Sequence, residues 1–327
     1  MRKSSDETLW LLAIGYWKCG QRLGYWLLNL MARSTAEILK KIRRLEIRTR
    51  RIVETAFSGE YHSVFRGHGM NFEEFRQYQI GDEIRAIDWR VTARMGDAYV
   101  RKYVEERELT ILLLVDVSAS GIFGTTTMTK RELAAEVACL LAFCAVNNND
   151  NVGLLLFTDK TELYIPPRKG RSHALRIIRE VLFFEPEHRG TDLVSALEFV
   201  NRVANRRAVV FLFSDFQNLD FERAASVCSK RHDLIAIPIE DPGEWQLPSA
   251  GLVRIEDPET GRTFEANFSS KKVQREFARI VSERRERRDA IFRRQAIDFL
   301  PLCTDKDYFP ILHSFFEHRE QRLKRGG

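Results

Sequence analysis

The second two thirds of the chain alternate between continuous apolar runs and stretches with helical periodicity. The apolar runs have the length and branching typical of buried strands, and they lie at Leu109–Val115, Asn151–Phe157, Thr161–Ile165, Ala208–Phe213, Asp233–Ile239 and Ile297–Cys303. Between and after them the pattern predicts helices over Lys130–Val146, Ser172–Phe184, Asp192–Ala204, Phe221–Lys230, 270–296 and Tyr308–Arg322. Such alternation predicts an α/β fold, with right-handed crossovers and a mainly parallel sheet flanked by helices.

The first third of the chain has a different pattern. A basic helix is expected over Thr35–Val53, followed by short strands and turns that form a small β-rich module. Strands are predicted at Phe72–Tyr78, Ala86–Ala93 and Ala98–Tyr103, with a hairpin turn at Met95-Gly96-Asp97. Trp89 would then lie on one strand face and pack in the core. We therefore divide the chain into residues 1–33, 34–108 and 109–327.

Residues 1–33 form an apolar, aromatic extension. Its runs Leu9–Trp17 and Leu23–Met31 are separated by Lys18, Gln21 and Arg22, so neither has the roughly 20 uninterrupted apolar residues that span a bilayer. The aromatic residues favour an interfacial helix and peripheral membrane contact through residues 9–31. A signal peptide, and a true start at Met31, are the alternatives.

Charge is unevenly distributed. The 327 residues carry a formal net charge of +6, which divides into +5 for residues 1–108, −2 for 109–241 and +3 for 242–327. The five cysteines are odd in number and include no C-x-x-C pair, which favours free buried thiols in a reducing compartment. An acidic centre suits cation binding, whereas the basic flanks suit an acidic protein or membrane surface.

Oxygen-bearing side chains follow the predicted strands where parallel strands end together. They are Asp116, Ser118 and Ser120 after the first buried run, Thr191 and Asp192 at the start of a helix, and Ser214 and Asp215 after the run AVVFLF. Ligands of such sheets bind at the carboxyl ends of the strands, and Mg²⁺ prefers carboxylate, hydroxyl and water oxygens. Asp and Ser also cap helices after strands, so a purely structural role is the plainer interpretation of each loop taken singly.

Two resemblances can now be stated. The strings D-V-S-A-S, G-T-D-L and S-D-F resemble the metal-ion-dependent adhesion site of von Willebrand factor type A domains. Over about residues 34–325 the chain also resembles the bacterial family called domain of unknown function 58. The motifs are Y-Q-I-G-D-E-I-R-A-I-D-W-R-V-T-A-R (Tyr78–Arg94), E-E-R-E-L-T-I-L-L-L-V-D-V-S-A-S and T-D-K-D-Y (Thr304–Tyr308).

The resemblance implies a von Willebrand factor type A-like, non-catalytic cytosolic protein that binds Mg²⁺ or Mn²⁺ and works with a MoxR-type AAA+ ATPase in chaperone-like maturation of protein complexes. The implied metal ligands are Asp116, Ser118, Ser120, Thr191 and Asp215, with Asp192 and Ser214 behind them. An open metal position would accept the carboxylate of a protein partner. Gly121 departs from many family members, which have Met or a similar residue after the second serine.

Three alternatives stay open. The site could be vestigial and hold no metal. The metal could support hydrolase or phosphatase chemistry, although Ser118 stands where a D-x-D phosphotransferase needs its second carboxylate. The basic helix and the Arg-rich segment 284–294 could bind nucleic acid, but acidic residues interleave the latter, as on solvated helix faces. A role in partner or interdomain contact is assigned to Asp82, Arg85, Asp88, Trp89 and Arg94.

Residues 1–30 lie outside the predicted folded modules. We expect a chain that begins at residue 31 to fold as the full chain does, with the same circular dichroism spectrum and melting temperature. Loss of the cooperative unfolding transition on this truncation would contradict the domain division.

Overall fold

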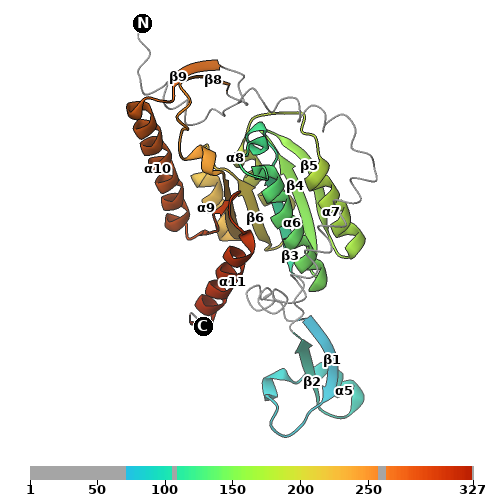
Figure 1. Ribbon diagram of the computed structural model, residues 1–327. Helices are drawn as coiled ribbons and strands as arrows, with labels where there is room; N and C mark the ends of the chain where they lie inside the picture. Colours follow the sequence, from blue (N-terminus) through green and yellow to red (C-terminus); the bar gives the residue numbers. More distant parts are fainter. Residues whose placement is uncertain (1–70, 105–108, 257–262, 326–327) are drawn as a thin grey trace. The chain divides into compact units, whose positions relative to one another are not determined.

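The computed structural model describes residues 71–104, 109–256 and 263–325 (Figure 1). They fall into two compact units, with the division between Leu109 and Thr110. The expectations for the extension 1–33 and for the basic helix lie outside the described residues. Among the helices of the described ranges, none is both long and apolar enough to cross a membrane.

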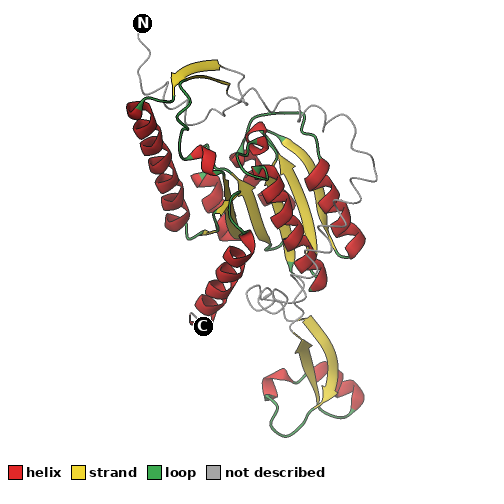
Figure 2. Cartoon of the chain, in the orientation of Figure 1, coloured by secondary structure: helices red, strands yellow, loops and turns green. Residues whose placement is uncertain are grey.

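The larger unit is built on a mainly parallel sheet with the order β10-β7-β6-β3-β4-β5. Strands β7, β6, β3 and β4 run parallel, and β5 is antiparallel to β4 at one edge. Their bounds are β3 Thr110–Asp116, β4 Asn151–Phe157, β5 Thr161–Arg168, β6 Val209–Ser214 and β7 Asp233–Glu240. The prediction of an α/β fold with a mainly parallel sheet is confirmed (Figure 2).

Helices cover the two faces of this sheet. In Figure 1, α6 and α7 lie in front of the strands, and α8 and α9 lie behind them. The helices are α6 Lys130–Asn147, α7 Arg171–Phe183, α8 Leu193–Val203, α9 Glu222–Arg231 and α10 Lys271–Arg294. One buried cluster joins Leu112 and Leu114 of β3 to residues of α8, α9 and α10. Cys139, Cys144, Cys228 and Cys303 are free and buried, as predicted for these four cysteines.

The C-terminal part of the larger unit departs from the prediction in two places. The single expected strand Ile297–Cys303 is two short strands, β10 (Asp298–Phe299) and β11 (Leu302–Cys303), which both pair with β7. The antiparallel pair β8 (Leu252–Glu256) and β9 (Thr263–Asn267) was not predicted. The chain then ends in α11 (Tyr308–Arg325), close to the expected helix.

The smaller unit contains one clear correction. Strands β1 (Asn71–Gln77) and β2 (Tyr99–Val104) pair as an antiparallel ladder, but the strand predicted at Ala86–Ala93 is wrong. The chain forms a short 3-10 turn at Ile84–Ala86 and then helix α5 (Trp89–Met95). Asp88 starts this helix by accepting hydrogen bonds from two backbone N–H groups, and Gly96 ends it at a φ of +86°.

Trp89 is therefore not a core residue. It is 66% exposed on α5, because the helical turn removes the two-residue alternation that placed it beside Ile87 and Val91. Asp82 forms an ion pair of 2.6 Å with Arg76, not with Arg85. Asp82 and Asp88 thus serve local turns, and the partner or interdomain role of Asp82, Arg85, Asp88, Trp89 and Arg94 stays a prediction.

The packing between β3 and β5 leaves no room at Gly153. A Cβ atom there would lie 2.9 Å from Leu112 Cδ2 and 3.0 Å from the Ile165 carbonyl oxygen. We expect Gly153→Ala to lower the free energy of unfolding by about 1–3 kcal/mol, measured by urea denaturation. The matched control is Gly121→Ala, where the nearest atom is 3.6 Å away and the change should stay within about 0.5 kcal/mol. Equal stability of both variants would contradict this packing.

Candidate metal centre

Asp116 is the last residue of β3, where the strand order of the sheet reverses. β4 lies on one side of β3 and β6 on the other, so the chain leaves β3 on one side and returns at β6 on the other. Such a switch point opens a crevice at the carboxyl ends of the strands. The carboxylate is buried, and its two oxygens accept hydrogen bonds from Ser118 N at 2.9 Å and from Ser214 Oγ at 2.7 Å. Ser214 thus holds Asp116 from the neighbouring strand, and its place behind a set of metal ligands stays a prediction.

The two serines of the first loop come together. Ser118 and Ser120 are buried, and their hydroxyl oxygens lie 3.0 Å apart. A 3-10 turn at Ala119–Ile122, which begins directly after Ser118, folds the chain so that the Ser120 hydroxyl lies beside the Ser118 hydroxyl. The arrangement places two neutral oxygen donors directly after the Asp116 carboxylate.

Asp215 is held by an unusual turn. Phe216 has a φ of +51°, a left-handed conformation that is strained for a bulky side chain. Its ring is fully buried, 5.3 Å from the ring of Phe221 and 5.2 Å from that of Phe292, measured between centroids. This packing fixes the turn, so the Asp215 carboxylate shares a hollow with Asp116 and Ser120.

Thr191 lies on a loop that backbone hydrogen bonds connect to two neighbouring loops. Arg189 O accepts from Ala119 N at 3.0 Å, and Asp192 N donates to Thr158 O at 2.9 Å. Asp192 itself caps α8 by accepting from two backbone N–H groups. The structure thus joins the Thr191 loop to the serine loop and to the end of β4, whereas Asp192 serves the helix.

Lys130 is a site residue that the sequence reasoning missed. It begins α6, is 2% exposed, and its Nζ lies 2.7 Å from Asp215 Oδ2 and 2.7 Å from Glu244 Oε1. Burial opposes the charge of the ammonium, but Asp215 and then Glu244 outweigh it and raise the pKa of Lys130 above its usual value. One sequence feature pointed there: a cation directly after the N-cap Thr129, where a helix prefers acidic residues.

Two carboxylates of the site have raised pKa values. Burial, and next the charge of Asp215, raises the pKa of Asp116 to about 6. Burial also raises the pKa of Glu244, although Lys130 acts in the opposite direction. A further cation beside Asp116 would stabilise its ionised form.

The donor set fits a hard divalent cation. Asp116, Ser118 and Ser120 offer a carboxylate and hydroxyl oxygens, which Mg²⁺ and Mn²⁺ accept together with waters. Within residues 71–104, 109–256 and 263–325, no cluster of three His, Cys, Asp or Glu side chains suits a metal. A cation beside Asp116 would be bound partly by hydroxyl oxygens, and the Lys130 ammonium already pairs with Asp215.

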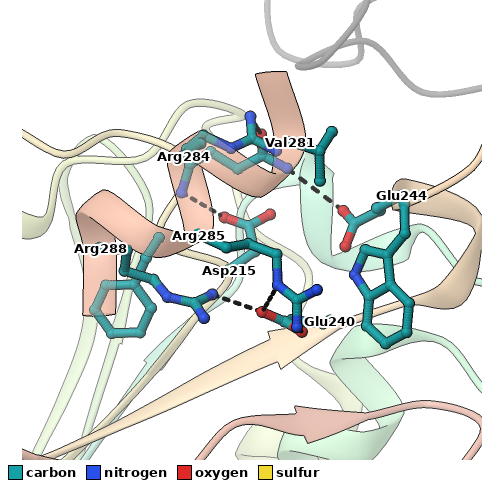
Figure 3. A pocket seen from close by; sticks show the side chains of 10 residues that line it. Asp215, Glu240, Glu244, Val281, Arg284, Arg285 and Arg288 are labelled. Atoms are coloured by element: carbon teal, nitrogen blue, oxygen red, sulfur yellow. Dashed lines mark hydrogen bonds and ion pairs between the residues drawn. The ribbon is translucent and has the colours of Figure 1, made fainter. Parts of the chain in front are cut away.

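An arginine-rich wall borders the site on the other side of Asp215 (Figure 3). Arg285 binds Glu240 with two hydrogen bonds of 3.1 and 2.8 Å, and Arg288 donates to the same carboxylate at 2.7 Å. The guanidinium of Arg285 also lies 4.7 Å from the ring centroid of Trp245. These ion pairs hold α10 against the end of β7. Part of the Arg-rich segment therefore stabilises the fold, which its sequence alone did not predict.

Comparisons with known proteins find a matching family and several similar chains. The family model described as "Protein of unknown function DUF58" matches residues 74–287. An uncharacterized protein of Mycobacterium tuberculosis is 30% identical over 288 residues, covering 87% of this chain and 90% of that protein.

Among solved structures, the conserved hypothetical protein BatB of Bacteroides thetaiotaomicron is similar, with a TM-score of 0.41 and 13% identity, covering 65% of this chain and 99% of that one. The VWA domain of SpRpn10 has a TM-score of 0.35 and 10% identity, covering 63% and 94%. Structural similarity at these identities and TM-scores gives no information about the ligands of this chain.

The raised pKa of Asp116 sets a pH dependence in metal-free protein. An unfolded aspartate has a pKa of about 3.9, so between about pH 4 and 6 the folded state binds the extra proton and stability falls as the pH rises. Above pH 6 the ionised Asp116 carboxylate lowers the free energy of unfolding by up to about 3 kcal/mol. In chelator at pH 7.5, Asp116→Asn should therefore unfold at a higher temperature than the native chain.

The difference should shrink toward pH 4.5, where Asp116 is protonated. Asp220→Asn, at an exposed aspartate outside the hollow, should show no such difference in the same thermal scans. A native chain that is the more stable of the two at pH 7.5 would contradict the cost of the buried Asp116 charge.

Proposed function

The chain belongs to the family of proteins of unknown function DUF58, and from its strand-end site we propose that it is a metal-dependent protein–protein interaction module. The bound ion is Mg²⁺ or Mn²⁺. It is held by Asp116, Ser118 and Ser120, with Thr191 and Asp215 completing the set directly or through water.

One observation carries this proposal. Asp116 is a buried carboxylate that shares a hollow with Asp215, and two buried hydroxyl oxygens follow it in the same loop. A buried charge in this situation is costly unless a cation joins it. A divalent ion bound there would be the largest local charge and would attract an anionic ligand to its open position.

The ligand we propose is an aspartate or glutamate side chain of a protein partner. By its family resemblance, the partner machinery is a cytoplasmic MoxR-type AAA+ ATPase that matures or assembles protein complexes. A binding role also suits the chemistry of the loop, since Ser118 occupies the place where a phosphotransferase would need a general acid.

The test measures binding of the MoxR-type ATPase of the same organism to the immobilised full chain. Binding should be present in Mg²⁺, lost in chelator, and lost on Asp116→Ala in Mg²⁺, because the cation then lacks its buried charged ligand. Glu198→Ala removes an exposed carboxylate from α8 and serves as the matched control, with binding unchanged.

Direct Mn²⁺ titration followed by electron paramagnetic resonance accompanies this assay. Saturable Mn²⁺ binding that requires Asp116 supports the metal centre independently of the partner. Partner binding that persists unchanged in chelator, or in Asp116→Ala, would contradict the proposal.

A further inference from the structure

A lysine ammonium stands beside the carboxylate that should complete the metal centre. Lys130 is buried at the start of α6, where the helix carries partial positive charge and disfavours a cation. Asp215 and Glu244, each 2.7 Å from its Nζ, offset this cost. The position of Lys130 is thus tied to the charges of the site as well as to the helix.

Lys130 shares its surroundings with the expected metal ligands. It lines the same hollow as Asp116, Ser120 and Asp215. A divalent cation held by Asp116 would face the ammonium at short range and would be repelled by it. The two cations would also share the oxygens of Asp215, so the ion pair as it stands weakens metal binding.

Glu244 provides a second partner for the ammonium. Its carboxylate is held by Asp241 N at 3.1 Å and by Gln217 Nε2 at 3.4 Å, within a capping box that starts the turn after β7. Glu244 therefore keeps its place whether or not Asp215 changes partner. Lys130 can release Asp215 and keep its ion pair with Glu244. The site then has two arrangements, one with Lys130 on both carboxylates and one with Lys130 on Glu244 only.

We infer that Lys130 is a resident counter-cation that closes the metal centre, and that a divalent ion loads only as Lys130 releases Asp215 and remains on Glu244. The inference rests on the proposed function, because it describes how that same site is regulated. Metal affinity is then set by competition between two cations. Any partner contact that favours the released arrangement of Lys130 raises metal affinity, and by linkage the metal raises partner affinity.

The first experiment compares Mn²⁺ binding by the native chain and Lys130→Met, by calorimetry and electron paramagnetic resonance. Removal of the competing cation should tighten binding about tenfold or more. Lys230→Met, at an exposed lysine of α9, is the matched control and should leave the Kd unchanged.

Thermal unfolding provides a readout that does not require a binding partner. In chelator, Lys130→Met should melt below the native chain, because Asp215 and Glu244 lose their counter-charge. Saturating Mn²⁺ should restore much of this loss, and should raise the melting temperature of the variant more than that of the native chain. Equal metal-induced shifts in the two chains would overturn the inference.

Glu244→Gln tests the second carboxylate partner of Lys130, and its expected effect on Mn²⁺ affinity is opposite to that of Lys130→Met. Lys130 then loses one of its two carboxylate partners and is held more strongly by Asp215, so Mn²⁺ binding should weaken. In the double variant Lys130→Met, Glu244→Gln this weakening should largely disappear, since the ammonium that Glu244 accommodates is gone. An equal effect of Glu244→Gln with and without Lys130 would mean a general charge effect, and would overturn the inference.

The failure of this inference differs from the failure of the proposed function. If Asp116-dependent Mn²⁺ binding is present and Lys130→Met leaves it unchanged, the counter-cation role fails and the metal centre stands. If neither chain binds Mn²⁺ in an Asp116-dependent way, both fail. Binding by Lys130→Met alone supports both, because it shows a donor set that the ammonium blocks.

Discussion

Buried carboxylates need a counter-charge, and this requirement organises the edge of the sheet at which β3, β6 and β7 end. Asp116 and Asp215 follow adjacent strands, and Glu244 follows the next one along the sheet. Burial, and next the charge of Asp215, raises the pKa of Asp116, and the Lys130 ammonium pairs with both Asp215 and Glu244. The cost of the buried Asp116 charge is the physical basis for a cation at this site.

The surrounding fold keeps these charges in place. Phe216 packs its turn into the core behind Asp215, and Glu240 receives two arginines from α10 directly beside it. The loop that carries Thr191 is joined to Ala119 and to Thr158 by backbone hydrogen bonds. Segments distant in sequence are thus held together at this edge of the sheet. Such preorganisation lowers the cost of ordering the ligands when a cation binds.

Much of this fold follows from periodicity, since the central strands are long apolar runs and their neighbours are amphipathic helices. The prediction was wrong at Ala86–Ala93, because Asp88 and Gly96 impose a capped helix on residues with strand-like composition. Asp116 and Asp215 could be brought together from strand ends alone, as parallel topology requires. Lys130 and Glu244 could not, because their pairing spans 114 residues and depends on how α6 and the turn after β7 approach the hollow.

The most direct test of the central claim is a crystal structure of the full chain with Mn²⁺, with an anomalous difference map recorded at the manganese edge. The account predicts one strong peak coordinated by Asp116 and the hydroxyl oxygens of Ser118 and Ser120, with the Lys130 ammonium on Glu244 and withdrawn from Asp215. A map without a peak at Asp116 and with the Lys130–Asp215 pair intact at saturating Mn²⁺ would contradict it.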